Sequence, residues 1–409
     1  MKIWIKYIIG IALGIGVALL LPFENRSAAN ILSFLTELSV RFGRYTILPV
    51  LFFSVSVAVF KLRTTRKIMK TTTLIVSVLV VSAAILTLIG LLSILIVRLP
   101  RIPIPAGKLS EISSISIEDL VFKLFPYSGF EAFLDGVYLL PLFLFAGLAG
   151  AGCAVDEVTS KPTVTLFNSI SKVAYHVMCF FVDMFAVGMI AISCTWFIEA
   201  LPVFKTGIYT PLIIMLSVDF ILIVFILYPV LMYLFCKGTH PFRILYASIC
   251  PILVGFFSGD SNLTLPIALR HGAESLGMSR KTNAITYPVF SVFARGGSAL
   301  VTSICFILIL TSYSSLSIPF TDILWIAGTS FVLSFLLGNI PVGGSFIALT
   351  VMCTMYGRGF EAGYLLLKPA ALIIGSFATA IDAATTMFGS YFVAHKLKMT
   401  NLYDVKHFI

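Results

Sequence analysis

The chain has 409 residues, with 28 Lys or Arg against 18 Asp or Glu, which gives a formal net charge of +10. Only 11% of the residues are charged and 59% are hydrophobic, whereas about 25% of the residues of a soluble protein are charged. Even large soluble domains bury only about 75% of the surface that they expose when unfolded. The composition therefore excludes a soluble fold, and it attributes the positive charge to the orientation of a polytopic membrane protein rather than to nucleic-acid binding.

Apolar stretches near or above the roughly 20 residues that cross a bilayer recur along the chain. They lie at about 3–22, 31–60, 71–98, 120–154, 164–199, 210–236, 282–311 and 363–395. We therefore predict an all-α fold of about eight transmembrane helices.

Basic residues indicate the orientation of these helices. Five of them crowd one short connection after the second span: Lys61, Arg63, Arg66, Lys67 and Lys70. Cytoplasmic loops carry an excess of Lys and Arg. We therefore expect a multi-pass protein of the plasma membrane (the bacterial inner membrane) with cytoplasmic N- and C-termini.

Two further apolar segments are interrupted by polar residues and glycine. The segment at about 242–276 is broken at 258–262, and the segment at about 323–357 is broken at 338–344. Each half has about 14 residues and spans about 21 Å as a helix, which is short of the ~30 Å hydrocarbon core. We interpret each segment as a re-entrant helical hairpin, the alternative being one kinked span apiece.

Each interrupted segment precedes a helix with a polar centre. The first of these helices carries Arg295 and the second carries Asp382. Interrupted segments in matching positions indicate the inverted repeats of a transporter, and the free helix ends at the breaks can bind ions. We therefore expect the site between the breaks.

Arg295 and Asp382 both fall near the middle of an expected span, where charge is costly. Arg295 could fix an anion or substitute for a bound cation; the alternative is an ion pair that only holds helices together. Asp382 could bind a substrate ammonium group, carry a coupling proton, pair with Arg295, or make a neutral packing hydrogen bond. Asp260, at the tip of the first hairpin, could line the cavity and neutralise Arg295, carry a proton, or lie in cytoplasmic water.

Enzyme signatures are absent from the sequence. There is no GxSxG, HExxH or Walker A motif, and the seven cysteines are scattered without a CxxC or Cys/His cluster. We expect no catalytic residues, no cofactor and no metal site, so secondary transport is the simplest function.

Three motifs resemble one transporter family. SGDSNLTLP at 258–266 resembles the first re-entrant hairpin of the dicarboxylate/amino acid:cation symporters of the glutamate-transporter type. IPVGGS at 340–345 is similar to the glycine-proline tip of that family's second hairpin, and DAATTM at 382–387 resembles its Asp-x-x-Arg-Thr-Met segment. The resemblance covers nearly the whole chain in order.

The resemblance implies a homotrimeric elevator. Scaffold helices 1–2 (residues 1–70) and 4–5 (120–209) would hold still in the lipid bilayer. The transport domain would comprise helix 3 with an external loop (71–119) and residues 210–409. Substrates in the family are acidic or small neutral amino acids and dicarboxylates, driven by sodium or protons. The implied substrate-binding residues are Asp260, Ser261, Asn262, Arg295, Ser298, Val342, Gly343, Gly344, Asp382, Thr385, Thr386 and Gly389.

The departures from the family pattern concern its sodium sites. Two carboxylates that coordinate sodium in the family are Gly296 and Val393 here, and an asparagine is Ala294. Hard cations need several oxygen ligands. We hypothesise that Arg295 supplies a fixed positive charge instead, and that transport is sodium-independent or driven by protons through Asp382 or Asp260.

Substrate identity is read from two positions. Asp382 matches the position that binds a substrate amino group, and the arginine that binds a side-chain carboxylate is Thr385 here, which favours a small neutral amino acid. One alternative is symport of an acidic amino acid or C4-dicarboxylate with a proton or sodium, in which Arg295 would hold the anion. A second is an anion-conducting channel with Arg295 as its pore charge. A third is an inactive scaffold protein.

Overall fold

The computed structural model describes residues 2–20, 26–103, 122, 126–134, 137–236, 240–314, 318–401 and 408. In this part of the chain the secondary structure is helical, with no strand. Eight of its helices are long and apolar enough to cross a membrane. The prediction of an all-α polytopic membrane protein is confirmed. Much of the expected external loop, residues 104–119, lies outside the described residues.

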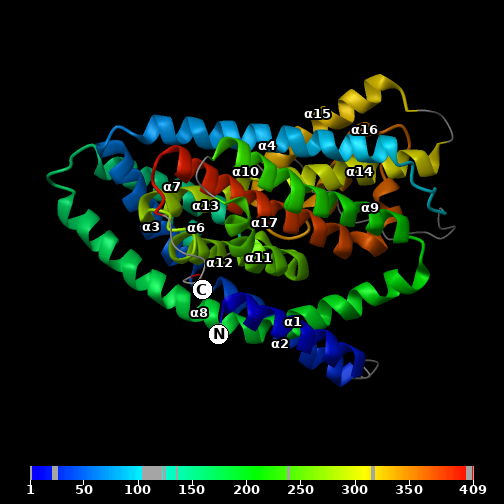
Figure 1. Ribbon diagram of the computed structural model, residues 1–409, viewed down its shortest axis with the longest axis horizontal. Coiled ribbons are helices and arrows are strands. Elements are labelled where there is room, and N and C mark those ends of the chain that lie inside the picture. The colour runs from blue at the N-terminus through cyan, green and yellow to red at the C-terminus, as the bar shows by residue number, and fades with distance from the viewer. Residues whose placement is uncertain are drawn as a thin grey trace.

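In the first half of the chain, the long helix α8 runs along one side of the molecule, and α4 runs along the opposite side (Figure 1). The helices are α1 (Ile3–Leu20), α2 (Arg26–Arg44), α3 (Ile47–Thr64), α4 (Ile68–Ile96), α6 (Glu131–Leu134), α7 (Leu139–Cys153) and α8 (Lys161–Thr206). With 46 residues, α8 is about 69 Å long, and α1, α2 and α3 pack along it.

Two expected spans differ from the structure. The stretch 31–60 is divided between α2 and α3, which are separated by a turn at Tyr45 and Thr46. Within the described residues of the stretch 120–154, the helices are α6 and α7, and α7 has 15 residues because Tyr138 is extended and the helix begins after it. Residues 120, 121, 123–125, 135 and 136 lie outside the described residues. Among the described residues of this stretch no helix has membrane-spanning length, whereas α11 is among the eight helices that do.

The second half contains two helical hairpins and the helices that follow them. The elements are α9 (Thr210–Ile221), the π-helical turn η1 (Leu222–Leu227), α10 (Tyr228–Phe235), α11 (Pro241–Ser258), α12 (Ser261–Glu274), α13 (Arg280–Phe293), α14 (Gly296–Tyr313), α15 (Phe320–Leu336), the 3₁₀ turn η2 (Leu337–Asn339), α16 (Gly344–Tyr356), the 3₁₀ helix η3 (Gly363–Ala370) and α17 (Ala371–Lys396).

Each hairpin folds at the break seen in the sequence. In the first, Gly259 has φ +60°, and the Asp260 carboxylate accepts from the backbone N–H of Asn262 at 2.8 Å, so it caps α12. In the second, Gly343 has φ +67° directly before α16. Glycine populates this left-handed conformation without the steric cost of a Cβ. In each hairpin the two helices pack against one another.

The helix expected at 282–311 is not continuous. It is divided into α13 and α14, with Arg295 at the break. The whole stretch Arg280–Tyr313 is nevertheless long and apolar enough to cross a membrane as one span, as expected. Two consecutive glycines, Gly296 and Gly297, follow the break, and glycine is a poor helix former.

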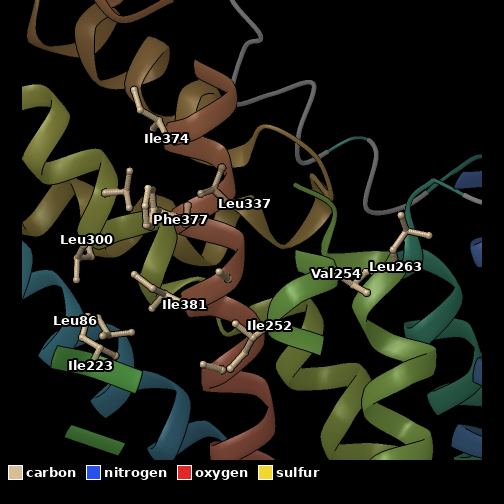
Figure 2. Packing of buried hydrophobic residues seen from close by; sticks show 14 of the residues in the cluster. Leu86, Ile223, Ile252, Val254, Leu263, Leu300, Leu337, Ile374, Phe377 and Ile381 are labelled. Atoms are coloured by element: carbon tan, nitrogen blue, oxygen red, sulfur yellow. The ribbon is translucent and has the colours of Figure 1, made fainter. Parts of the chain in front are cut away.

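The core of the bundle lies around α14 and α17, nearly all of whose residues are buried. Figure 2 shows Phe377 and Ile381 of α17 among apolar side chains that include Leu300 of α14 and Ile252 of α11. Because most residues of these two helices are covered by protein, their buried polar side chains contact one another, the hairpins or the neighbouring helices.

The two ends of the described chain meet at one side chain. Lys2 donates to the hydroxyl of Tyr246 at 3.1 Å, and the ring of Phe408 lies 6.0 Å from the ring of the same tyrosine. The first and last described residues therefore lie at the same end of the bundle.

Candidate functional site

The tips of the two hairpins touch through their backbones. Asp260 and Val342 form an isolated antiparallel bridge, and the N–H of Ser261 donates to the carbonyl of Pro341 at 3.1 Å. Tight turns bring both backbones together at this point. The break between α13 and α14 faces the tips, because Arg295 contacts Ser261 and the carbonyl of Ile340. The middle of α17 adjoins the same break, because Asp382 contacts Ser298 and lies 4.0 Å from Arg295.

Arg295 is the buried centre of this region, with 3% of its surface exposed. Its guanidinium donates to the hydroxyl of Ser261 in the first hairpin and, at 3.2 Å, to the carbonyl of Ile340 in the second. Its Nε donates to the carbonyl of Val292 at 3.3 Å. A single cationic side chain thus bonds to both hairpins at once.

Asp382 caps the break that Arg295 occupies. One carboxylate oxygen accepts from the N–H groups of Gly297 and Ser298 at 2.7 and 3.2 Å, and the other accepts from the Ser298 hydroxyl at 2.7 Å. An acid at a helix N-terminus satisfies free donors and stabilises the positive end of the helix dipole. The Arg295 guanidinium lies 4.0 Å away, so the Asp382 carboxylate is held mainly by α14.

Asp260 has an ion-pair partner that the sequence analysis missed. The Nη2 and Nε atoms of Arg44, at the end of α2, donate to one Asp260 oxygen at 2.6 and 2.9 Å. The Asp260 side chain is 3% exposed, so it does not lie in open water as one alternative held. The expected direct partner, Arg295, bonds to the neighbouring Ser261 instead.

The sequence did contain a signal for Arg44. It falls inside the apolar stretch 31–60, and an ionisable residue within an expected span is a functional-site candidate by default. With Arg44 included, Arg295, Asp260 and Asp382 form a cluster of two cations and two anions. The formal charge of this cluster is zero without a bound ion.

The remaining predicted residues divide into two groups. At the tips, the Asn262 amide donates to the carbonyl of Val137 at 2.7 Å, while Val342 is 48% exposed beside Gly343 and Gly344. Thr386 is buried in α17, where its hydroxyl donates to the Asp382 carbonyl at 2.9 Å.

The surroundings of Thr385 and Gly389 differ from those of the hairpin tips. The hydroxyls of Thr385 and Tyr228 lie 2.5 Å apart, and both threonine and glycine line an apolar cavity of about 440 Å³ between α4, α10 and α17. The structure therefore brings together Asp260, Ser261, Arg295, Ser298 and Asp382, and it places Thr385 and Gly389 at this second cavity.

The positions that hold sodium in the resembled family are surrounded by apolar groups. Val393 and Ala294 lie in one hydrophobic cluster with residues of α3, α4 and α13. A Cβ at Gly296 would come within 2.7 Å of a Leu86 methyl group. Within the described residues there is no group of three or more His, Cys, Asp or Glu side chains that could hold a metal ion.

Gly297 should tolerate no side chain, because α17 lies too close. An added Cβ would lie 2.6 Å from the Ile381 Cβ and 2.8 Å from the Asp382 carboxylate. We expect Gly297→Ala to destabilise the protein by about 1–3 kcal/mol through overpacking and a displaced cap, seen as a lower midpoint of thermal unfolding in detergent. The control is Gly375→Ala in α17, where no atom lies within 4 Å of the added Cβ. Equal midpoints for the two variants would contradict the prediction.

Comparison with known proteins gives one assignment. The model of the sodium:dicarboxylate symporter family matches residues 3–396, nearly the whole chain. No curated protein matches the sequence. Members of the family are membrane transporters rather than enzymes, in agreement with the eight apolar helices and the two hairpins. On this match, the chain belongs to the sodium:dicarboxylate symporter family.

Proposed function

We propose that the chain is a secondary transporter of a small neutral amino acid that works without sodium, because the Arg295 guanidinium takes the place of a bound cation. The observation that carries this proposal is the contact of Arg295 with both hairpin tips, through Ser261 and the carbonyl of Ile340. A bound ion would organise the tips in the same way by attracting oxygen atoms from both.

The surroundings of the former sodium positions support this proposal. Hard cations require several oxygen ligands, and Ala294 and Val393 pack in an apolar cluster. The charge balance of Arg44 and Arg295 with Asp260 and Asp382 is also complete without a further cation. Protons remain available as the coupling ion through Asp382 or Asp260, since a carboxyl group is the natural carrier of a proton in a buried site.

Uptake into proteoliposomes tests the proposal. We expect uptake of a small neutral amino acid such as alanine or serine to be unchanged when sodium is replaced by choline, and to respond to an imposed proton gradient. Uptake that stops in choline would refute sodium independence. If C4-dicarboxylates or acidic amino acids alone are taken up, the substrate is an anion, and the alternative in which Arg295 holds that anion is favoured. Steady current without saturation by any substrate would indicate an anion channel instead.

The architecture leads to a mechanistic proposal as well. Helices α1, α2, α3 and α7 pack with α8, whereas α4, α11, α13 and α14 pack around α17. We assign the first group to a fixed scaffold and the second group, with α9, α10, α12, α15 and α16, to a moving transport domain of a homotrimer in the bacterial inner membrane. The two chain ends meet at Tyr246, which is compatible with cytoplasmic N- and C-termini. Mass measurement in detergent tests the trimer, and tag accessibility in intact cells tests the orientation.

A further inference from the structure

The cavity at Thr385 and Gly389 is an apolar groove on the outer side of α17. Its volume is about 440 Å³, and its walls are the first half of α4, α10 and the second half of α17, with side chains that include Leu74, Ile85 and Phe392. In Figure 1, α4 and α10 lie along one edge of the bundle, and α17 lies farther in. Val81 of α4 and Phe235 of α10 are 54% and 53% exposed, so this edge faces lipid in a membrane-embedded chain.

The polar groups that line the groove already have partners. Ser77 and Ser82 donate to carbonyls of their own helix at 2.8 and 3.0 Å. The hydroxyls of Tyr228 and Thr385 bond to one another. A polar substrate would therefore find apolar surface and satisfied hydroxyl groups, whereas a hydrocarbon chain would leave no donor unpaired.

On two of the helices that form the groove, α4 and α17, a lysine lies at the end of the face that lines it. On α4, Lys70 precedes Leu74 by four residues, and on α17, Lys396 follows Phe392 by four residues, so each lies on the same face as groove residues. The Lys396 ammonium lies 5.5 and 6.0 Å from the ring centres of Phe392 and Phe235, which both line the groove.

Both lysines lie at the same end of the groove. Leu74, near Lys70, and Leu397, beside Lys396, pack on the same hydrophobic cluster. From Leu74 to Ile85 the groove extends for about 17 Å of helix, which is close to half of the ~30 Å hydrocarbon core. The groove therefore has the length of one leaflet and carries positive charge at one end only.

We propose that this groove binds an anionic phospholipid, with one acyl chain between α4, α10 and α17 and the phosphate at Lys70 and Lys396. The site is independent of the proposed sodium-free transport, because it involves neither Arg295 nor the hairpin tips. Each lysine near the membrane surface contributes about fivefold to the affinity for an anionic lipid, so the pair contributes about 25-fold.

The test measures lipid binding to the purified full-length chain. Protein in detergent is titrated with dioleoyl phosphatidylglycerol or dioleoyl phosphatidylcholine, and the thermal unfolding midpoint and the bound lipid in native mass spectra are recorded. The variant is Lys70→Gln/Lys396→Gln. The control is Lys161→Gln/Lys172→Gln, which removes the same charge from exposed positions of α8, a helix that does not line the groove.

We expect phosphatidylglycerol to raise the midpoint of the wild type more than phosphatidylcholine does. The Lys70/Lys396 variant should bind it about 25-fold more weakly, while the α8 control should bind it within twofold of the wild type. Ser82→Phe, which fills the groove and leaves both lysines in place, should also lower lipid retention.

Three results would overturn the proposal. Equal stabilisation by the two lipids would remove the need for the lysines. An equal loss in the α8 control would indicate a general effect of net charge. Full stabilisation by water-soluble glycerol phosphate would show that an anion alone is bound and that the groove holds no acyl chain.

Discussion

Replacing Arg295 with methionine should reduce initial uptake by the reconstituted protein by at least about 100-fold. The guanidinium donates to Ser261 and to the Ile340 carbonyl across the two tips. Hydrogen bonds of a charged group contribute about 1.5–3 kcal/mol each, so the loss of two amounts to about 3–6 kcal/mol, or at least two decades in rate if the closed tips are required for transport. Uptake in choline medium measures the effect.

Two further variants help to identify the cause of that loss of uptake. Arg295→Lys keeps the charge but cannot donate in two directions from a rigid plane, so we expect partial uptake. Arg41→Met removes an arginine that is 76% exposed and pairs with Glu37 of its own helix, and it should leave uptake unchanged. If Arg295→Met transports normally without sodium, the assignment of Arg295 as a fixed cation is wrong. If it transports only with sodium, the assignment is supported.

Replacing Arg44 with methionine should be the most destabilising change at the tip of the first hairpin. It leaves the Asp260 carboxylate, which is 3% exposed, without its ion-pair partner. Removing one partner of a buried pair costs about 3–5 kcal/mol, because the other charge remains buried. We expect a clearly lower midpoint of thermal unfolding in detergent.

A double-mutant cycle isolates the pair from the rest of the site. Arg44→Met/Asp260→Asn removes both charges, so it should recover most of the stability lost in Arg44→Met alone. The exposed variant Arg41→Met, on the same helix, should stay near the wild type. A double variant less stable than Arg44→Met would mean that the two side chains act separately.

The hairpins could be predicted because their signal is local. Each apolar segment is interrupted by polar residues and glycine, at Gly259–Asp260 and at Gly343–Gly344, and glycine at each turn supplies the left-handed backbone. The partner of Asp260 could not be found in this way. Arg44 is more than 200 positions away along the chain, and only the packing of α2 beside α12 brings the two together.

The grouping of Thr385 with Asp382 followed from the resemblance of residues 382–387 to the family's Asp-x-x-Arg-Thr-Met segment, and residues three apart do lie on neighbouring parts of one helix face. Periodicity specifies the face of α17 but not the helices that cover it. Asp382 meets the start of α14, whereas Thr385 meets Tyr228 of α10. In the same way, hydropathy alone suggested a full fourth span at 120–154, although Pro126, Gly129 and Gly136 lie in its first half.

The hydrogen bond from the Ser261 N–H to the Pro341 carbonyl joins the two hairpin tips to one another. Lifting either tip breaks this N–H···O bond together with the Arg295 contact of the tip that moves, and lifting the first tip also breaks the ion pair of Asp260 with Arg44. A substitution that weakens this hydrogen bond should therefore let substrate leak toward both sides of the membrane rather than toward one side. Directionality in this protein would then depend on the position of the hairpins relative to α2 and the other helices around α8, because the ion pair of Arg44 with Asp260 ties only the first tip to α2.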